Sequence, residues 1–351
     1  MNIISKTVRL VLVLSIALLT MNGFAQMKEE NRKITDMSGR NVIIPAKVNR
    51  IISLSNNTSV YIYTLAPDKL IGWSFNQKPA AAKFMDAKYF NLPVLGTSTE
   101  KTSSYENILK LRPDIVICSN EDEVYAADDI QKQLGIPVLM VDTALESTPE
   151  VYRFLGECLG EQTRAKQLAT YSRNVLNRIR KLLRKLPDDK RLRVYYAEGS
   201  GLQTDVAGNV HTEALDFVKG KNVADISETH VGSMIGVSME QVLAWNPDVI
   251  IIGISRQGDF YNDVFHDVNW ANIKAVKEKK VYRMPALPFN WFDRPPSPAR
   301  ILAVEWLANL LYPQYVKLDL SHEVKAFFVL FYHYQLNDQE VQELLKDAVP
   351  R

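Results

Sequence analysis

The chain has 351 residues, of which 42 are basic and 40 are acidic. The first 25 residues hold two of the basic residues, Lys6 and Arg9, and none of the acidic ones, so the remainder has no net formal charge. That balance provides no broad electrostatic field for nucleic acid or anionic lipid, and a remainder of about 325 residues suits two domains better than one.

The first 25 residues have the pattern of a secretory signal peptide. Lys6 and Arg9 precede the apolar run 10–19, and small residues up to Ala25 suit cleavage before Gln26. An uncleaved membrane anchor is the weaker interpretation, because the apolar run is too short to span a bilayer comfortably. No cysteine lies near the cleavage point. We therefore expect a protein of the periplasm that is exported through a cleaved signal peptide and is not a lipoprotein.

Residues 26–160 predict a first α/β lobe. Apolar, β-branched runs alternate with amphipathic segments in this part of the chain. That rhythm is typical of a largely parallel sheet with helices on both faces. In chain order we expect strands at 50–54, 70–73, 93–96, 114–118 and 137–141, with helices ending near Leu65, over 104–111 and over 125–134.

One long helix is predicted over 163–186, within a connecting segment that we place at 161–187. Apolar residues recur there in steps of three and four, which gives one apolar stripe, and basic residues occupy the opposite face. The helix is roughly 35 Å long at 1.5 Å per residue, enough to run along two lobes, and Pro187 ends it. The basic face suits an anionic partner or solvent, and solvent is the favoured interpretation.

Residues 188–351 predict a second α/β lobe with a helical tail. Ser297 and Pro298 suit the N-cap and the first turn of a helix. The tail, 320–350, has the pattern of two helices with aromatic faces, which we expect to pack on a lobe. The other elements expected in this lobe are strands at 193–197, 248–252 and 280–284, helices at 211–218 and 298–311, and loops at 198–201 and 288–296.

One phrase occurs twice in the chain, once in each predicted lobe. Residues 105–117 read YENILKLRPDIVI and residues 239–251 read MEQVLAWNPDVII. Each copy is a helix, a turn and a buried strand, with a glutamate, Glu106 or Glu240, seven residues before Pro-Asp. Two such copies indicate two similar α/β lobes, and a chain of this kind usually works in the cleft between them.

Ligand residues are predicted from a rule of α/β folds, in which loops at the carboxyl ends of parallel strands line the crevice. Arg256 and Arg294 suit a carboxylate, phosphate or oxyanion, and the rings of Trp73 and Trp291 suit a macrocycle or catecholate. Two alternatives stay open: Trp291 braces its proline-rich loop, and Arg294 pairs with Asp293. The ligand-binding candidates are Ser55, Asn56, Asn57, Trp73, Ser119, Asn120, Ser200, Arg256, Trp291 and Arg294.

Neither a bare metal site nor a catalytic motif is predicted. The five histidines show no paired spacing with a third ligand, and Cys118 and Cys158 suit two buried free thiols or one disulfide. The chain has no G-x-S-x-G, HExxH or Walker A motif, and no G-x-G-x-x-G after a strand. We therefore expect a binding protein with no intrinsic cofactor, although enzymes also occur on two-lobed folds.

Five phrases in a fixed order carry a resemblance to a known family. They are DMSGRNVIIPAKVNRIISLS, YENILKLRPDIVI, GKNVAD, VSMEQVLAWNPDVIIIG and RPPSPARILAVEWLANLLYP, and the likeness covers residues 34–313. The chain resembles the class III periplasmic substrate-binding proteins of ABC importers, which carry iron–siderophores, cobalamin, haem and some metal oxyanions. The resemblance implies two α/β lobes joined by one long helix, with a metal chelate (ferric siderophore, cobalamin or haem) captured between them. A metal oxyanion such as molybdate or tungstate is the alternative, and a non-transport receptor or an enzyme on the same fold is less favoured.

The resemblance also implies a partner. A monomer would deliver its ligand to the permease dimer of an importer that has a cytoplasmic ATPase. In this family one carboxylate per lobe docks on arginines of one permease subunit, and Glu106 and Glu240 fall on the matching positions. A structural alternative remains, because a carboxylate in a first helical turn favours the helix dipole and Ser103 with Glu106 has capping-box spacing.

Overall fold

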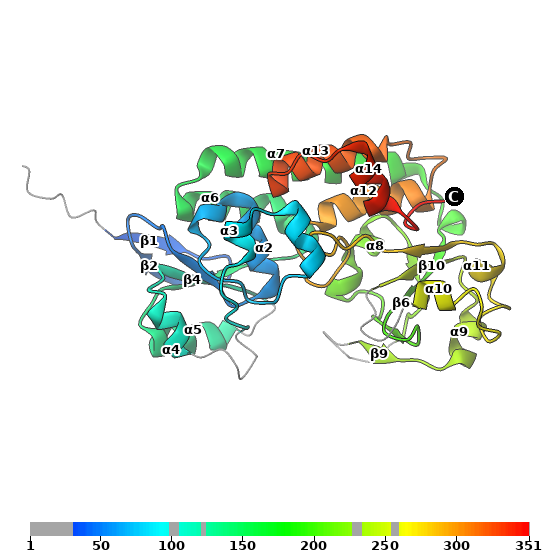
Figure 1. The fold of residues 1–351 in the computed structure, drawn as a ribbon, viewed down its shortest axis with the longest axis horizontal. Helices are drawn as coiled ribbons and strands as arrows, with labels where there is room; N and C mark the ends of the chain where they lie inside the picture. The colour runs from blue at the N-terminus through cyan, green and yellow to red at the C-terminus, as the bar shows by residue number, and fades with distance from the viewer. Residues whose placement is uncertain (1–30, 98–104, 121–123, 227–233, 254–259, 351) are drawn as a thin grey trace, which may run out of the picture.

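The computed structural model describes residues 31–97, 105–120, 124–226, 234–253 and 260–350. Figure 1 shows two α/β lobes side by side, with long helices along the upper side of both. Parallel sheets flanked by helices confirm the predicted fold class. The predicted signal peptide, 1–25, lies outside the described residues.

The sheet of the first lobe has three parallel strands. β4 (Ile115–Ser119) lies in the middle, between β3 (Ile51–Ser53) and β5 (Val138–Val141). Alternate residues along these strands belong to two different core clusters, so both faces of the sheet are covered. The other elements of this lobe are β1 (Arg32–Thr35), β2 (Asn41–Ile44), α2 (Asn56–Leu65), α3 (Ala87–Phe90), α4 (Tyr105–Lys110), α5 (Val124–Leu134) and α6 (Thr148–Leu159).

Two predicted strands of the first lobe, 70–73 and 93–96, are wrong. Each makes only isolated bridges, Ile51 with Leu70 and Trp73 with Val94. A 3₁₀ turn, η1 (Pro67–Lys69), comes directly before the first segment. Pro93 has no backbone N–H to donate in the second, so no run of consecutive pairs forms.

The sheet of the second lobe has four parallel strands in the order β11-β10-β6-β8. Its centre is the pair β6 (Arg193–Ala197) and β10 (Val249–Ile252), and nearly all of their residues are buried. The edge strands are β8 (Lys221–Asn222) and β11 (Val281–Arg283). A separate antiparallel pair consists of β7 (Gln203–Thr204) and β9 (Ile235–Gly236). The helices of this lobe are α8 (Glu213–Phe217), α9 (Met239–Trp245), α10 (Phe260–Asp263) and α11 (Lys274–Lys277).

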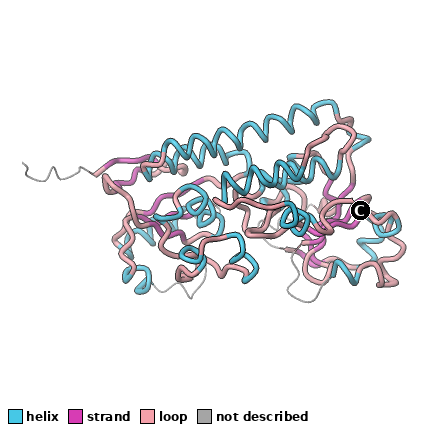
Figure 2. The backbone as a smooth tube through the Cα atoms, turned by 45° about the horizontal axis from the view of Figure 1, so that its top comes forward, coloured by secondary structure: helices cyan, strands magenta, loops and turns pink. Residues whose placement is uncertain are grey.

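The predicted long helix is present as α7 (Gln162–Leu182), continued by the 3₁₀ turn η4 (Leu183–Lys185). Its buried positions fall at the expected steps of three and four, from Ala165 to Ile179. Part of its basic face is structural rather than solvated, because Arg178 pairs with Glu305, whose side chain is fully buried, and with Glu323. Figure 2 shows α7 running along both lobes.

The helical tail packs on both lobes rather than on one. It consists of α13 (Leu320–Tyr332) and α14 (Asp338–Leu345), and α12 (Arg300–Leu311) comes before it in the chain. The ring of Phe331 lies 5.9 Å from that of Tyr152 in the first lobe, while Arg283 N in the second lobe donates to Asp347 O at 2.7 Å. One helix boundary differs from the prediction, because α12 begins at Arg300 and Ala299 is its N-cap in place of Ser297.

Both copies of the repeated phrase fold alike. The residue before Pro-Asp, Arg112 or Asn246, has positive φ in each copy (46° and 42°). Asp114 Oδ2 accepts from Arg50 N at 2.9 Å, and Asp248 Oδ2 accepts from Arg193 N at the same distance. The repeated aspartate therefore fastens the start of its strand to the strand beside it in both lobes.

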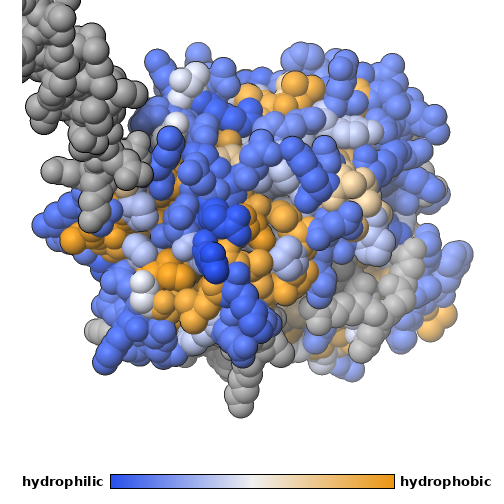
Figure 3. Space-filling view, turned by 60° about the vertical axis from the view of Figure 1, so that its left-hand side comes forward, coloured by the Kyte–Doolittle hydropathy of each residue, from blue (hydrophilic) through white to orange (hydrophobic). Residues whose placement is uncertain are grey.

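The surface and the cysteines complete the description. On the face that Figure 3 brings forward, hydrophobic residues gather toward the middle and hydrophilic residues surround them. None of the described helices is long and apolar enough to cross a membrane. Cys118 and Cys158 are both buried and free, so of the two alternatives the free thiols are confirmed.

Candidate functional site

The segment after the carboxyl end of β5 in the first lobe contacts α8 and α12 of the second lobe where the two lobes join. Arg300, at the start of α12, donates to Thr143 O beyond β5 and, at 2.5 Å, to Glu213 Oε2 on α8. Glu213 Oε2 also accepts from Leu145 N at 2.8 Å. Arg300 is fully buried. This junction is the place where the crevice rule predicts a ligand.

A charged cluster lies on the second-lobe side of this junction. Arg294 Nε donates to Glu198 Oε1 at 3.0 Å, and Nη2 donates to Asp205 Oδ2 at 2.6 Å. Asp293 Oδ2 lies 3.2 Å from Arg294 Nε, and His211 Nε2 lies 3.4 Å from Nη1. We call these five residues the Arg294 cluster. The carboxylates are almost completely buried, whereas 32% of the Arg294 side chain is exposed, so the arginine is the member that reaches solvent.

Burial sets the protonation of the Arg294 cluster. It raises the pKa of Glu198 to about 8 and that of Asp293 to about 7, because a buried carboxylate loses its hydration. Burial, with help from the charge of Arg294, lowers the pKa of His211 to about 4. Burial is the largest single effect on Arg294 and opposes its charge, but the hydrogen bond to Glu198 and the charges of the three carboxylates together outweigh it and raise that pKa. Near neutral pH the cluster thus combines a charged arginine, a neutral imidazole and carboxyls able to hold protons.

Several polar atoms of the Arg294 cluster are buried without a hydrogen-bond partner among the described residues. They are Glu198 Oε2, Asp205 Oδ1, His211 Nδ1 and Asp293 Oδ2. Leaving such an atom unpaired costs about 1–3 kcal/mol, so native proteins usually satisfy it with a ligand or an ordered water. Because Asp293 Oδ2 forms an ion pair with Arg294 Nε at 3.2 Å and lies 3.8 Å from His211 Nδ1, Glu198 Oε2 and Asp205 Oδ1 are the two atoms that most need a ligand or an ordered water.

The same residues can also bring metal-binding atoms together. Asp205, His211 and Asp293 each offer one such atom, and these lie within 4.8 Å of one another. Two features favour a hydrogen-bonding ligand over a bare cation. The guanidinium of Arg294 already supplies a positive charge to both carboxylates. It also faces His211 Nε2, which favours the tautomer with its hydrogen on Nδ1.

Most candidates from the first lobe meet at the facing edge of the junction. Ser55 Oγ accepts from Ser119 N at 2.9 Å, and Asn57 Nδ2 donates to Thr143 Oγ1 at 3.0 Å. Asn120 Nδ2 donates to Asp142 Oδ1 at 3.2 Å. Asn56 adds a buried Oδ1 with no partner among the described residues. The structure therefore brings Ser55, Asn56, Asn57, Ser119 and Asn120 to one polar edge.

The remaining candidates divide into three cases. Trp73 and Trp291 are fully buried, and their indole N–H groups donate to Tyr89 O and Leu287 O, so neither presents an open ring face in this conformation. Ser200 is exposed on the turn after β6. Arg256 lies outside the described residues. The bracing alternative fits Trp291 and the pairing alternative fits Arg294.

Sequence reasoning missed several members of the site: Glu198, Asp205, His211, Asp293 as a site residue, and Arg300. Asp205 directly follows the two-residue strand β7, and His211 lies in the 3₁₀ turn Val210–Thr212, but neither segment has the long apolar run that predicts a strand from sequence. Glu198 and Asp293 lie in the predicted loops 198–201 and 288–296. Their acidic side chains in loops that follow strands were the sequence signal that could have identified them as site residues.

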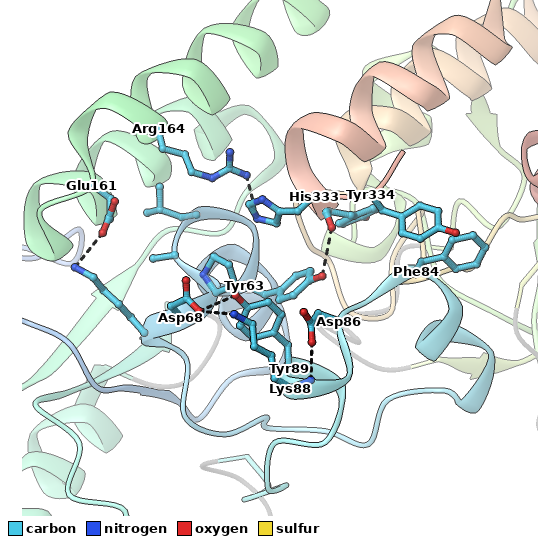
Figure 4. Close-up of a pocket in the computed structure, with 15 residues that line it drawn as sticks. Tyr63, Asp68, Phe84, Asp86, Lys88, Tyr89, Glu161, Arg164, His333 and Tyr334 are labelled. Carbon is cyan, nitrogen blue, oxygen red and sulfur yellow. Dashed lines mark hydrogen bonds and ion pairs between the residues drawn. The ribbon is translucent and has the colours of Figure 1, made fainter. Parts of the chain in front are cut away.

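A cavity of about 560 Å³ lies elsewhere, among α2, α3, α7 and the end of α13 (Figure 4). Within the described part of the chain its basic side chains are already engaged. Lys88 pairs with Asp68 at 2.9 Å and Lys69 with Glu161 at 3.1 Å. Arg164 donates to Thr64 O at 2.8 Å. We therefore take the junction, where polar groups lack partners among the described residues, as the candidate site in preference to this cavity.

Comparison with known proteins identifies the family. The model of a family described as periplasmic binding protein matches residues 62–287. The chain is a periplasmic binding protein. This membership confirms the predicted family, the class III substrate-binding proteins of ABC importers, and implies a periplasmic location.

Three relatives show the range of similarity of this periplasmic binding protein. A solved structure of an ABC transporter solute-binding protein from Sulfurospirillum deleyianum is 32% identical, with a TM-score of 0.83, and covers 90% of this chain and 99% of that one. The molybdate-binding protein MolA of Haemophilus influenzae is 29% identical over 86% of this chain and 91% of its own length. The vitamin B12-binding protein of Salmonella choleraesuis is 28% identical over 61% of this chain and 75% of its own length.

The predicted docking residues of this periplasmic binding protein are exposed, one on each lobe. Glu106 lies on α4 and Glu240 on α9. In Figure 1 both helices lie along the lower side of the molecule, opposite α7. Ser238, and not Glu240, caps α9 by accepting from Gln241 N. Ser103, the other half of the suggested capping box with Glu106, lies outside the described residues.

Proposed function

We propose that this periplasmic binding protein captures a metal chelate, such as a ferric siderophore, cobalamin or haem, between its lobes and delivers it to an ABC importer. The observation that carries the proposal is the Arg294 cluster, which holds buried polar atoms without hydrogen-bond partners among the described residues. Such a site binds and releases a ligand. Among the residues that the structure describes, no nucleophile paired with a base lies there, and we propose that the ligand leaves chemically unchanged.

The composition of the cluster supports a chelate over a simple oxyanion. Three carboxyl groups surround one arginine, and the arginine is already paired with them. A molybdate dianion would have to displace these carboxylates, whereas a large ligand with hydroxyl or amide donors would satisfy them. The B12-binding relative, whose ligand is a cobalt chelate, agrees with this preference.

Molybdate or tungstate is the second candidate, and a specific observation favours it. MolA matches more of this chain than the B12-binding relative does, and at similar identity. Protonation of Glu198 and Asp293, whose pKa values burial raises, would lessen the repulsion of an anion.

A thermal-shift panel distinguishes the two candidates. A ligand at 100 times its dissociation constant stabilises the folded state by about 2.7 kcal/mol. We expect stabilisation by at least one of ferric siderophores, cobalamin or haem, and none by molybdate or tungstate. Stabilisation by molybdate alone would replace the first candidate with the second. Recovery of a chemically altered ligand would contradict a pure binding role.

We further propose that eight of the ten predicted residues line the ligand path and that Trp73 and Trp291 support it from within the core. The exposed or partly exposed members are Asn56, Asn120, Ser200 and Arg294. Substitution of Asn120 by Ala tests the first-lobe side, with Asn107→Ala on α4 as an exposed control. Equal ligand affinity in both variants would remove Asn120 from the set.

Docking on the importer is proposed to use Glu106 and Glu240, each meeting basic side chains on one of two permease subunits, with the protein acting as a monomer. Their exposure on one side of the molecule supports this geometry. Exposed ion pairs contribute only about 0–1 kcal/mol each, so the pair should set orientation and encounter rate more than affinity. Transport that survives the double change Glu106→Arg and Glu240→Arg would refute this role.

Export through a cleaved signal peptide at 1–25, without a lipid anchor, is also proposed. Amino-terminal sequencing and the intact mass of protein from the periplasm test this step. A sequence that begins at Gln26 with an unmodified mass supports it, and a chain that retains residues 1–25 contradicts it.

A further inference from the structure

The two copies of the repeated phrase match in more than sequence. Over 105–116 and 239–250, buried, half-buried and exposed residues follow the same order, position for position. Ile108 and Val242 are the fully buried helical residues in the two copies. The helix, turn and strand of each copy therefore expose matching positions to solvent in the two lobes.

A large apolar side chain is exposed at the same position of each copy. Leu109 is 45% exposed and Leu243 is 40% exposed. A single exposed leucine needs no explanation, but two at matching positions, on helices that lie on the same side of the molecule, are a repeated surface feature. The core does not require them, because Ile108 and Val242 already fill the inward position.

Each exposed leucine lies beside a docking carboxylate. Glu106 and Leu109 are three residues apart on α4, and Glu240 and Leu243 are three apart on α9. Residues with this spacing share one helix face. An exposed amide side chain, Asn107 or Gln241, follows the glutamate in each copy. Because residues one or two apart on a helix do not face each other, the amide lies off this face, and each lobe carries a patch of one carboxylate and one leucine, which we call the lobe patch.

The two lobe patches differ in charge. Lys110 pairs with Glu106 at 2.9 Å, and Ala244 stands at the corresponding position of the second copy. Among the described residues Glu240 has no basic partner, and its backbone N–H and Ser238 lower its pKa. The second-lobe patch therefore has a net negative charge, whereas the first-lobe patch is close to neutral.

We propose that Leu109 and Leu243 are the apolar anchors of the importer interface, each entering an apolar recess beside a basic side chain on one permease subunit. This inference rests on the proposed docking role of the two glutamates and names what else the partner must provide. The charge difference assigns electrostatic steering mainly to Glu240, while the first lobe binds mainly through Leu109. An apolar anchor surrounded by polar groups is the usual arrangement at the centre of a protein interface.

The test uses the full-length protein and its importer complex in nanodiscs, with binding followed by biolayer interferometry. Leu109→Asn and Leu243→Asn are each expected to weaken binding about tenfold, and the double variant about a hundredfold, mainly through faster dissociation. Val329→Asn is the matched control, because Val329 is 53% exposed on α13 at the opposite side of the molecule. It should bind like the wild type. Because all three side chains are exposed, the unfolding temperature should change little in every variant.

The charge difference between the two lobe patches is tested separately, by the association rate. Glu240→Gln should lower the association rate and its salt dependence more than Glu106→Gln does, because Lys110 already offsets Glu106. Equal effects of the two changes would overturn the assignment of steering to the second lobe.

Failure of this inference is distinguishable from failure of the docking proposal. If the double leucine variant binds within twofold of the wild type while Glu106→Arg with Glu240→Arg abolishes binding, the anchors are refuted and the docking face stands. If neither pair of changes weakens binding, the docking face itself is refuted. Loss of binding in both supports both.

Discussion

Replacement of Arg294 by Met tests the electrostatics of the site. The change keeps much of the aliphatic side chain but removes the charge that lies 2.6–3.2 Å from Glu198, Asp205 and Asp293. Removing one partner of a buried ion pair costs about 3–5 kcal/mol, and since about a third of the Arg294 side chain is exposed we expect the lower end, about 3 kcal/mol.

The loss should depend on pH, and its sign follows from the pKa values. Burial raises the pKa of Glu198 to about 8 and of Asp293 to about 7. Loss of the arginine raises both pKa values further. The variant therefore loses most stability at high pH, where the carboxyls of the unfolded state are ionised and those of the folded state must ionise without the arginine. The free energy of unfolding should therefore fall by more at pH 8.5 than at pH 5.5.

Urea denaturation of both proteins at the two pH values measures this difference. The control is Arg173→Met, which breaks an exposed pair with Glu150 and should cost no more than about 1 kcal/mol at either pH. A loss for Arg294→Met below that of the control, or a loss that is equal at both pH values, would refute the proposed electrostatics of the cluster.

Four further predictions concern the site and the fold. Glu198→Gln should flatten the pH dependence of stability, because the wild-type carboxyl, with its pKa raised from 4.5 to about 8, stabilises the fold below pH 4.5 and loses that contribution as pH rises through 8; an unchanged slope between pH 5 and 8 in urea denaturation would contradict this. Gly201→Ala should cost more than about 2 kcal/mol, because φ is +93° and the new Cβ would lie 2.2 Å from the ring of Phe260. Gly208→Ala, where φ is +78° and space is open, should cost only about 1 kcal/mol, so equal losses would rule out the clash. The two buried cysteines should react with a thiol reagent only after unfolding, and an absence of thiols in the unfolded protein would demonstrate a disulfide. Because α7 runs along both lobes, ligand should change the radius of gyration little, and a large change in the radius of gyration by X-ray scattering would contradict that expectation.

The sequence predicted the parts of this fold that depend on local patterns. Three such patterns are the apolar runs of β4 and β10, the apolar stripe of α7, and the Pro-Asp after each repeated helix. Each determines the conformation of only the few residues around it. The predicted strand at 70–73 failed because pairing over several residues needs a neighbour in register, and the fold offers only single bridges there.

The site was harder to predict, because it is assembled from distant segments. Asp205, His211 and Asp293 become neighbours only through the packing of the second lobe. Trp73 ends a segment that was predicted to be a strand, and Trp291 lies in a loop after β11, yet their bulk fills the core instead. Spacing along a chain does not distinguish a ring that faces a ligand from one that packs inside the lobe.

Ligand capture by the Arg294 cluster is tested most directly by calorimetric titration with the molecule that co-purifies from the native periplasm. Wild-type protein and Asp205→Asn are compared, with the unfolding transition of each recorded to confirm that the variant is folded. We expect the dissociation constant to rise at least about tenfold in the variant and the ligand to be recovered unchanged. Equal affinity in the two folded proteins would contradict binding at this cluster.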